Sequence, residues 1–343
     1  MRGYVVSYNA NTGALTLGVD QATGAGEQAD WVLGVAATGA ADPASAIHGA
    51  GEKAVPVDAD ELGIIDSASG WALKKLTWAG LKAVLLAYFK GQFRERLTGP
   101  RTYYVRTDGN DGSAGLANTA AGAFRTVQKA IDTVVALDLS TYNVTIQLGD
   151  GTYAEACTLK PYVTGGGAVT ILGNTATPAN VLINAAGNAF MASSCGQWTL
   201  NGFKLQAGGG RGLFAMGASQ INLLNINWGA CTYEQILSQL GATVRLNGNQ
   251  TISGSAPAFI NATTNAYAGG ASISITLSGT PAFSYFAQCD MGANVILQTI
   301  TFTGSATGAR YSVSANGVIQ TYGGGASYLP GSTNGSASGG LYL

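Results

Sequence analysis

Acidic side chains are the first candidates for chemistry in this 343-residue sequence, because a pair of carboxylates can hydrolyse a glycosidic bond. Residues 140–343 contain only four acids, which are Asp150, Glu155, Glu234 and Asp290. Asp150 precedes a glycine and is typical of a turn, and more than two periods of the repeat described below separate Glu234 from Asp290. We therefore expect no catalytic residue within one chain. In an enzyme, these four acids would have to pair across an oligomer interface to form a polysaccharide depolymerase.

Metal and redox chemistry also have few candidates. The sequence has one histidine, His48, and its four cysteines stand at least 36 residues apart, which does not fit a zinc knuckle or a disulfide framework. We expect the cysteines to be small buried apolar side chains. The segment Asp108–Gly112 offers oxygen ligands but lacks the distal glutamate of a calcium-binding loop, and it is typical of a turn. The sequence predicts neither a metal site nor a cofactor.

Aromatic side chains on a nearly uncharged surface are better candidates for ligand binding. Only 10% of the residues are charged, against about 25% in ordinary soluble domains. Glycan sites combine aromatic faces with neutral hydrogen-bonding groups. Six aromatic residues near predicted corners and loops form the candidate set: Trp228, Tyr233, Tyr267, Tyr285, Tyr322 and Tyr328. Each could instead pack a corner or an interface between chains, so the prediction concerns the group.

Charge and hydropathy argue against two classes of partner. The formal net charge is −1, which leaves no basic surplus for nucleic-acid phosphates or an anionic membrane surface. The longest strongly apolar stretch, residues 81–89, is far shorter than the about 20 residues that span a bilayer. The first residues lead into polar sequence, so we expect no secretory signal. We expect neither nucleic-acid binding nor membrane insertion.

Bulky apolar residues recur through the second half of the chain. Phe190, Phe214, Ile236, Phe259 and Phe283 are spaced by 22–24 residues. A second series of short apolar runs begins at Trp198, Ile221, Val244, Ile273, Val295 and Val318. This period indicates a solenoid, and two or three short strands per period fit one coil of a parallel β-helix. We expect the phenylalanines to form one internal column. A β-sandwich is the alternative, but it does not require a fixed period.

Three further elements are expected before the repeat. Residues 4–17 alternate around an Asn/Gly turn and predict a β-hairpin, followed by a Gly/Ala/Thr linker over residues 22–51. Apolar residues from Leu73 to Phe89 recur at helical spacing, with Thr77 as a plausible N-cap. That helix would form a neck shared by several chains or pack on the downstream domain. Residues 124–135 predict a second helix that covers the open end of the solenoid.

Several segments resemble known proteins. Residues 104–112, residues 123–131 and the tripeptide Gly151–Tyr153 resemble the entry motif of pectate-lyase-like right-handed parallel β-helix proteins. Residues 3–15, 60–66, 76–82 and 323–331 resemble modules of bacteriophage tail fibres and tailspikes. The resemblance implies a homotrimer that is assembled in the host cytoplasm, is carried on the virion tail, contacts other tail or baseplate proteins and binds a host cell-surface glycan.

These observations predict a mainly β protein in four parts. The parts are a hairpin attachment module with its linker (1–50), a junction with a helical neck (51–100), a parallel β-helix (101–322, of which 101–139 form the cap and 140–322 the coils) and a C-terminal tail (323–343). The expected function is host attachment by glycan binding. A tailspike depolymerase, acting as a glycosidase or a lyase, and a purely structural spike or adaptor are the alternatives.

Overall fold

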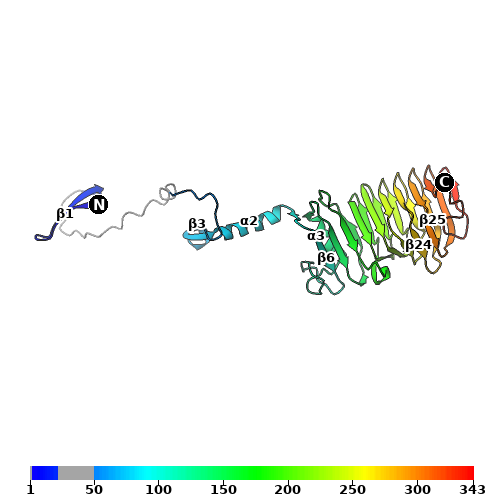
Figure 1. Ribbon diagram of the computed structural model, residues 1–343, viewed down its shortest axis with the longest axis horizontal. Helices are drawn as coiled ribbons and strands as arrows, with labels where there is room; N and C mark the ends of the chain where they lie inside the picture. Colours follow the sequence, from blue (N-terminus) through cyan, green and yellow to red (C-terminus); the bar gives the residue numbers. More distant parts are fainter. Residues whose placement is uncertain (1, 22–49) are drawn as a thin grey trace. The chain divides into compact units, whose positions relative to one another are not determined.

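The computed structural model describes residues 2–21 and 50–343 (Figure 1). The chain divides into two units between Ala83 and Val84. His48 and nearly all of the predicted linker lie outside the described residues. Within the described ranges, no helix has both the length and the apolar character needed to cross a bilayer.

The first unit contains two antiparallel strand pairs. β1 (Arg2–Asn9) pairs with β2 (Ala14–Gln21), and β3 (Glu61–Asp66) pairs with β4 (Ala72–Thr77) around the short 3-10 helix η1 (Ser67–Ser69). Leu73 and Leu76 therefore lie in a strand and not in the expected helix, because both pair with β3. The helix α2 (Trp78–Gln92) begins after Thr77, whose hydroxyl accepts the Gly80 amide at 3.1 Å. This bond confirms Thr77 as the cap.

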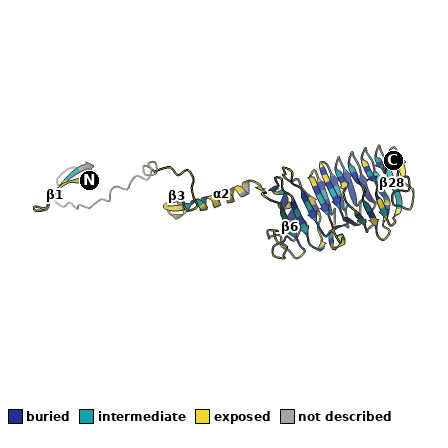
Figure 2. Ribbon diagram, in the orientation of Figure 1, coloured by how far each residue is buried: buried dark blue, intermediate teal, exposed yellow. Residues whose placement is uncertain are grey.

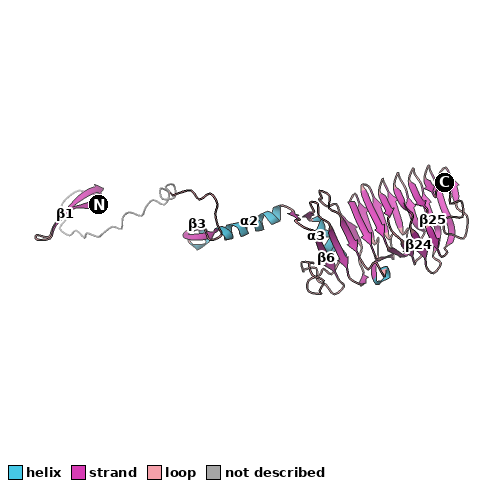
Figure 3. Cartoon of the chain, viewed as in Figure 1, coloured by secondary structure: helices cyan, strands magenta, loops and turns pink. Residues whose placement is uncertain are grey.

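Three parallel sheets form the second unit (Figures 1 and 3). The ten-stranded sheet contains β6 (Arg101–Val105), β8 (Val144–Leu148), β11 (Val169–Leu172), β14 (Gly196–Asn201), β17 (Ser219–Leu224), β20 (Thr243–Leu246), β23 (Tyr267–Ala271), β26 (Asn294–Gln298), β29 (Val318–Gln320) and β31 (Leu341–Tyr342). The seven-stranded sheet contains β9 (Gly151–Tyr153), β12 (Val181–Ala185), β15 (Lys204–Ala207), β18 (Ile226–Cys231), β21 (Gln250–Ile252), β24 (Ser274–Leu277) and β27 (Thr301–Thr303). The eight-stranded sheet contains β10 (Cys157–Leu159), β13 (Phe190–Ser193), β16 (Leu213–Met216), β19 (Ile236–Gln239), β22 (Ala258–Ala262), β25 (Ala282–Cys289), β28 (Thr307–Ser314) and β30 (Ser336–Ser338).

Successive turns of backbone add one strand to each sheet in the same order, which confirms the predicted parallel solenoid. For example, Trp198 pairs with Ile221 in the ten-stranded sheet, and Ile221 pairs with Val244 on the next strand. All three side chains are fully buried. The next residue in this column is Ala268, and it is followed by Val295. The apolar run at Ile273 was expected in this series, but it belongs to the seven-stranded sheet.

The expected single column of phenylalanines is wrong in its register. Phe190 pairs with Leu213, and the column continues through Ile236 and Ile260. Phe214 pairs instead with Met191 on the outer face and is only partly buried. Phe214 comes one residue after Leu213, the position that pairs with Phe190. A shift of one residue turns a strand side chain to the opposite face of the sheet.

The second predicted helix caps the start of the solenoid. α3 (Val127–Val135) buries Val127, Ala130, Ile131 and Val134, and Thr126 is its N-cap through a bond from the Lys129 amide. Phe124 precedes the helix, and its backbone forms a bridge with Val105. The remaining regular elements are β5 (Glu95–Arg96), β7 (Leu137–Asp138), which pairs with β5, and the 3-10 helix η2 (Pro178–Asn180).

Candidate functional site

A groove on the outer face of the ten-stranded sheet brings together two of the six candidate aromatic residues. Its volume is about 470 Å³, and it crosses β20, β23 and β26 to the turn after β29. Tyr267 and Tyr322 line it, together with the polar side chains of Arg245, Asn247 and Gln298. No carboxylate is among its lining residues.

The groove exists because β23 carries small residues at outward positions. Alternation along β23 places Tyr267, Gly269 and Ala271 on the outer face, since the paired positions of β20 and β26 show the same alternation of buried and exposed residues. Gly269 lies between Arg245 on β20 and Ile296 on β26. The strand therefore presents one aromatic side chain, then Gly269, which is buried, and then the small exposed Ala271, between two strands with longer side chains.

Glycine is required at position 269 by its surroundings. Its φ is +156°, and a Cβ atom built there would lie 1.9 Å from the carbonyl oxygen of Ile296. Such a contact is far closer than real Cβ atoms allow, so a larger residue would have to move the strand. The floor of the groove is thus made of backbone that approaches its neighbour closely.

The two tyrosines of the groove differ in exposure and in backbone conformation. Tyr267 is half-buried, and burial raises the pKa of its hydroxyl, while the nearby Arg245 charge acts in the opposite direction. Tyr322 is 57% exposed and has a φ of +56°, a region that bulky side chains rarely occupy. The turns after earlier strands of the same sheet place Ser272 and Thr299 in this conformation. Tyr322 is therefore an unusually large residue for its corner.

The polar groups of the groove are largely available to a ligand. The Arg245 side chain is exposed and has no hydrogen bond or salt bridge to any residue in the described ranges. Asn247 donates its amide to Asn222 Oδ1 at 3.0 Å, which leaves its own carbonyl oxygen as an acceptor. A guanidinium, amide groups and two phenol rings around a shallow groove can bind a polar ring by stacking and hydrogen bonding.

The other four candidate aromatic residues lie elsewhere. Trp228 is fully buried and donates its indole N–H to Gln250 Oε1 at 3.1 Å, so the expectation that it could present its ring to a ligand is wrong. It is inward-facing on β18, in register with the buried Leu205 and Ile252. Tyr328 hydrogen-bonds the backbone of Ile300 and packs against Phe302.

Tyr233 and Tyr285 lie near the eight-stranded sheet. Tyr285 lies on β25 and is partly exposed. Tyr233 is half exposed, and its ring centroid lies 5.1 Å from the Arg211 guanidinium, which also lies over Phe214. Arg211 in turn donates to Glu234 Oε2 at 2.7 Å. Tyr233 therefore belongs to a separate surface cluster with a paired cation.

Asp150 and Glu155 lie on one turn of the solenoid at opposite ends of β9, Glu234 and Asp290 lie on two later turns, and each acid already has hydrogen-bond donors. Asp150 accepts bonds from the amides of Asn174 and Asn180. Glu234 is bound by Arg211, and also by Asn261 at 3.2 Å. Asp290 accepts the hydroxyl of Thr263. No two of these four side chains share a hydrogen-bond partner among those found in the described ranges, and none lines the groove.

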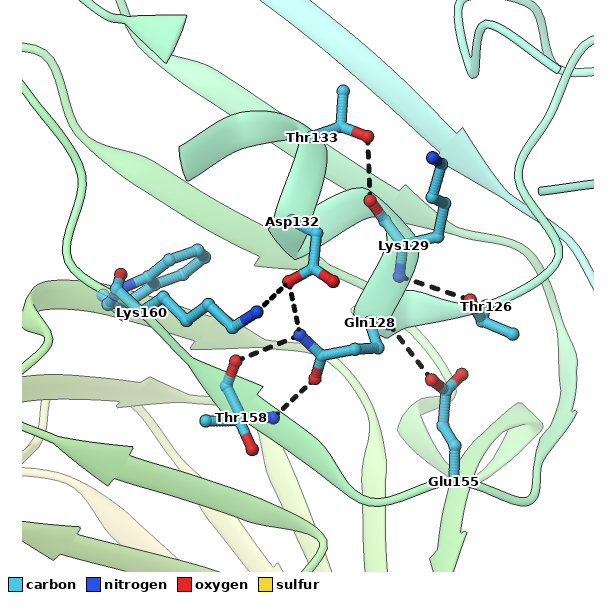
Figure 4. A network of polar contacts seen from close by, with 9 residues as sticks. Thr126, Gln128, Lys129, Asp132, Thr133, Glu155, Thr158 and Lys160 are labelled. Carbon is cyan, nitrogen blue, oxygen red and sulfur yellow. Dashed lines mark hydrogen bonds and ion pairs between the residues drawn. The ribbon is translucent and has the colours of Figure 1, made fainter. Parts of the chain in front are cut away.

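Glu155 holds the first turn of the cap helix (Figure 4). Its two carboxylate oxygens accept the backbone N–H groups of Val127 and Gln128 at 2.8 and 3.0 Å. Asp111 uses both of its oxygens on Arg125 and Thr126 just before the helix. Burial raises the pKa of the Glu155 carboxyl, with a smaller contribution of the same sign from the Asp111 charge. The arrangement satisfies free helix amides and does not resemble an acid and base waiting for substrate.

Metal and thiol chemistry gain no support within the described ranges. No group of three or more His, Cys, Asp or Glu side chains there is placed to hold a metal ion. All four cysteines (Cys157, Cys195, Cys231 and Cys289) are buried and free, as expected. Burial raises the pKa of each thiol, to about 11 for Cys231 and Cys289. These thiols are poor nucleophiles at neutral pH.

Sequence reasoning missed Arg245, Asn247, Gln298 and the glycine floor. A signal was present in the irregular interval of 29 residues between the apolar runs at Val244 and Ile273. The true counterpart of Val244 is Ala268, within a strand that reads Tyr-Ala-Gly-Gly-Ala. A turn of the solenoid in which small residues replace β-branched ones marks the place where the surface is hollowed.

Comparison with protein-family models, with curated proteins and with solved structures finds no match for this chain.

Proposed function

We propose that this chain is a bacteriophage tail-fibre or tailspike protein that attaches the virion to its host by binding a cell-surface glycan in the groove between Tyr267 and Tyr322. The observation that carries the proposal is the composition of the groove, in which aromatic, amide and guanidinium groups meet on the outside of a solenoid with no carboxylate among them. The fibre-like motifs at residues 3–15, 60–66, 76–82 and 323–331 supply the virion context.

The chemistry of the groove suits a sugar better than an apolar ligand. The C–H face of a sugar ring can stack on a tyrosine, and its hydroxyls can exchange hydrogen bonds with amide side chains. Tyr267 and Tyr322 supply two such rings, and Asn247 and Gln298 supply the amides. The four acids that a depolymerase would use are bound to other groups away from the groove. Binding without cleavage is therefore the function that we propose.

The apolar surface of α2 supports a trimer. Val84, Leu86 and Tyr88 are about 60% exposed (61%, 57% and 62%), and Phe93 just beyond the helix is 67% exposed. Much of α2 has the colour of exposed residues in Figure 2. Exposed large apolar side chains of this kind indicate an interaction site, and a helix that is apolar on several sides suits the centre of a bundle. The resemblance to tail fibres makes two further copies of this chain the partners. Three identical grooves would then raise the avidity for a repetitive glycan.

The first strand pair is the part proposed to contact other tail or baseplate proteins. Tyr4, Val5, Val6 and Tyr8 on β1 are all more than half exposed, so apolar side chains lie on both faces of the pair. A two-stranded hairpin is marginal alone, and burial of these faces against other virion proteins would stabilise it. The proposed location of the protein is thus the virion tail.

The test is adsorption of the purified full-length protein to host cells and to their isolated surface polysaccharide. We expect binding without release of reducing ends. Tyr267→Ala should lower the affinity about tenfold, whereas Tyr233→Ala, which removes an exposed ring outside the groove, should not change it. Shortening of the polymer would favour the depolymerase. Incorporation into virions without any surface binding would favour a purely structural spike and overturn the proposed function.

A further inference from the structure

We infer that the groove selects an anionic saccharide and that Arg245 binds its negatively charged group. The inference rests on the proposed glycan-binding function and adds to it the charge class of the ligand. A carboxylate of a uronic acid and a phosphate of a sugar-phosphate polymer share the chemistry that a guanidinium recognises.

The position of Arg245 leaves one side of its guanidinium open. Within the ten-stranded sheet, Arg245 pairs with Asn222 on β17 and with Gly269 on β23. Its neighbours at the same outward position are thus one neutral amide and one residue without a side chain. Gly269 and Arg245 both line the groove, so a ligand group that enters there meets the positive charge of Arg245 and no side chain at position 269.

No acid of the protein neutralises this charge in the described ranges. Two other cations of the solenoid have counter-ions, since Arg211 pairs with Glu234 and Lys160 pairs with Asp132. Lys204 and Arg310 have no ion pair in the described ranges, but neither lines the groove. Arg245 has neither an ion pair nor a hydrogen bond in those ranges, and no carboxylate lines the groove. An anion therefore gains the attraction of Arg245 without competing against a bound carboxylate.

The aromatic and cationic groups are close enough to act on one sugar residue. Tyr267, Tyr322 and Arg245 line the same groove, and Arg245 on β20 pairs with Gly269, two residues after Tyr267 on the neighbouring strand β23. A sugar ring stacked on Tyr267 would bring an acidic substituent within reach of Arg245. Its remaining hydroxyls would lie near Asn247 and Gln298, which line the same groove.

The test compares matched charged and neutral polymers. The probes are purified bacterial polysaccharides that contain uronic acids, each also used after chemical reduction of its carboxyl groups, and a glycerol-phosphate polymer as the phosphate arm. We expect the wild-type protein to bind at least one charged form about tenfold or more tightly than the neutral form, with the arm that binds identifying the anion. The preference should weaken at high salt.

Variants separate the charge effect from loss of the site. Arg245→Gln should remove the preference, so that the charged and the reduced polymers bind equally, and Arg245→Lys should keep part of it. Lys204→Gln, on β15 of the seven-stranded sheet, is the control for a general loss of positive charge and should have no effect. Equal binding of charged and reduced polymers, or a preference that survives Arg245→Gln, would overturn the inference.

The proposed function is tested separately by Tyr267→Ala. If this variant loses adsorption to host cells while Arg245→Gln changes nothing, glycan attachment stands and only the anion selectivity is wrong. Failure of the wild-type protein to bind any glycan or host surface would overturn both. Thermal unfolding of each variant would confirm that the solenoid is intact.

Discussion

Arg245 on β20 and Gly269 on β23 are directly paired across the ten-stranded sheet, so the position next to the arginine on the neighbouring strand carries no side chain. On the far side of Gly269, the next residue in register is Ile296. The groove thus owes its floor to the small residues of β23, Gly269 and Ala271, within an otherwise regular ladder. Strand register fixes this floor, and the turn after β29 adds Tyr322.

Substitution of Gly269 is expected to damage both stability and binding. An alanine Cβ at this position would lie 1.9 Å from the Ile296 carbonyl oxygen, and the φ of +156° is also unfavourable for it. We expect Gly269→Ala to lower the free energy of unfolding by about 1–3 kcal/mol, because the strand must shift. Denaturant unfolding followed by circular dichroism measures this change.

Gly241→Ala is the matched control for the backbone part of this effect. Gly241 also has a positive φ, of +78°, but a Cβ there would meet no atom within 4 Å. It should cost only about 1 kcal/mol and leave glycan binding intact. Equal destabilisation by the two substitutions would show that close contact with Ile296 is not what requires glycine at position 269.

Tyr322 is expected to separate stability from binding. Its φ of +56° is readily adopted by glycine but is strained for a bulky residue. Tyr322→Gly should therefore leave the midpoint of thermal unfolding unchanged or raise it. More than half of the residue is exposed, so the substitution removes little packing. Affinity for the glycan should fall because one wall of the groove is removed. A marked loss of thermal stability would instead identify Tyr322 as a packing residue.

Periodicity in the sequence was sufficient to predict the solenoid, because each turn must repeat the same buried positions. It was not sufficient to predict which side chains share a column. Phe214 differs from its expected register by one residue, and that shift places it on the outer face with Met191. A spacing that varies by one residue between turns therefore predicts the fold correctly but does not predict which side chains face the interior.

The candidate site was predicted in part. The aromatic set included Tyr267 and Tyr322, which do meet in the groove, but also Trp228, which fills the core. Composition and corner position cannot distinguish these cases, since the difference depends on which face of a strand a residue occupies. Arg245 could not be selected because its importance comes from Gly269, which lies 24 positions later in the chain and next to it in space.

The exposed apolar residues of α2 are expected to hold the oligomer together. Leu85→Glu combined with Phe89→Glu places charges among side chains that are now exposed and apolar, so the proposed trimer should dissociate to monomers. Sedimentation equilibrium measures the mass. The thermal transition of the solenoid should persist, because neither residue belongs to its buried core. Gln92→Glu, which adds a charge at a polar position of α2, is the control. A wild-type monomer at micromolar concentration would contradict the trimer.

Glu155 is expected to make stability depend on pH. Burial, reinforced by the Asp111 charge, raises the pKa of its carboxyl above the ordinary value of 4.5, and this outweighs the lowering by the Val127 and Gln128 amides. In the window between 4.5 and the raised value, the folded protein holds a proton that the unfolded chain has lost. Stability from this group is thus fully present below pH 4.5 and is lost as the pH rises through the folded pKa.

Glu155→Gln removes this ionisation and isolates its effect. The other titrating groups, including Asp132 with its lowered pKa, are common to both proteins and cancel in the difference between their free energies of unfolding. That difference should shift in favour of the variant as the pH rises from 4 towards 7 and then become constant. Denaturant unfolding at pH 4, 5, 6 and 7 measures it, and a carbon-13 titration of the carboxyl reports the pKa directly. A difference that is constant over the whole range, or that shifts in favour of the wild type, would mean that the helix amides and not burial dominate at this carboxylate.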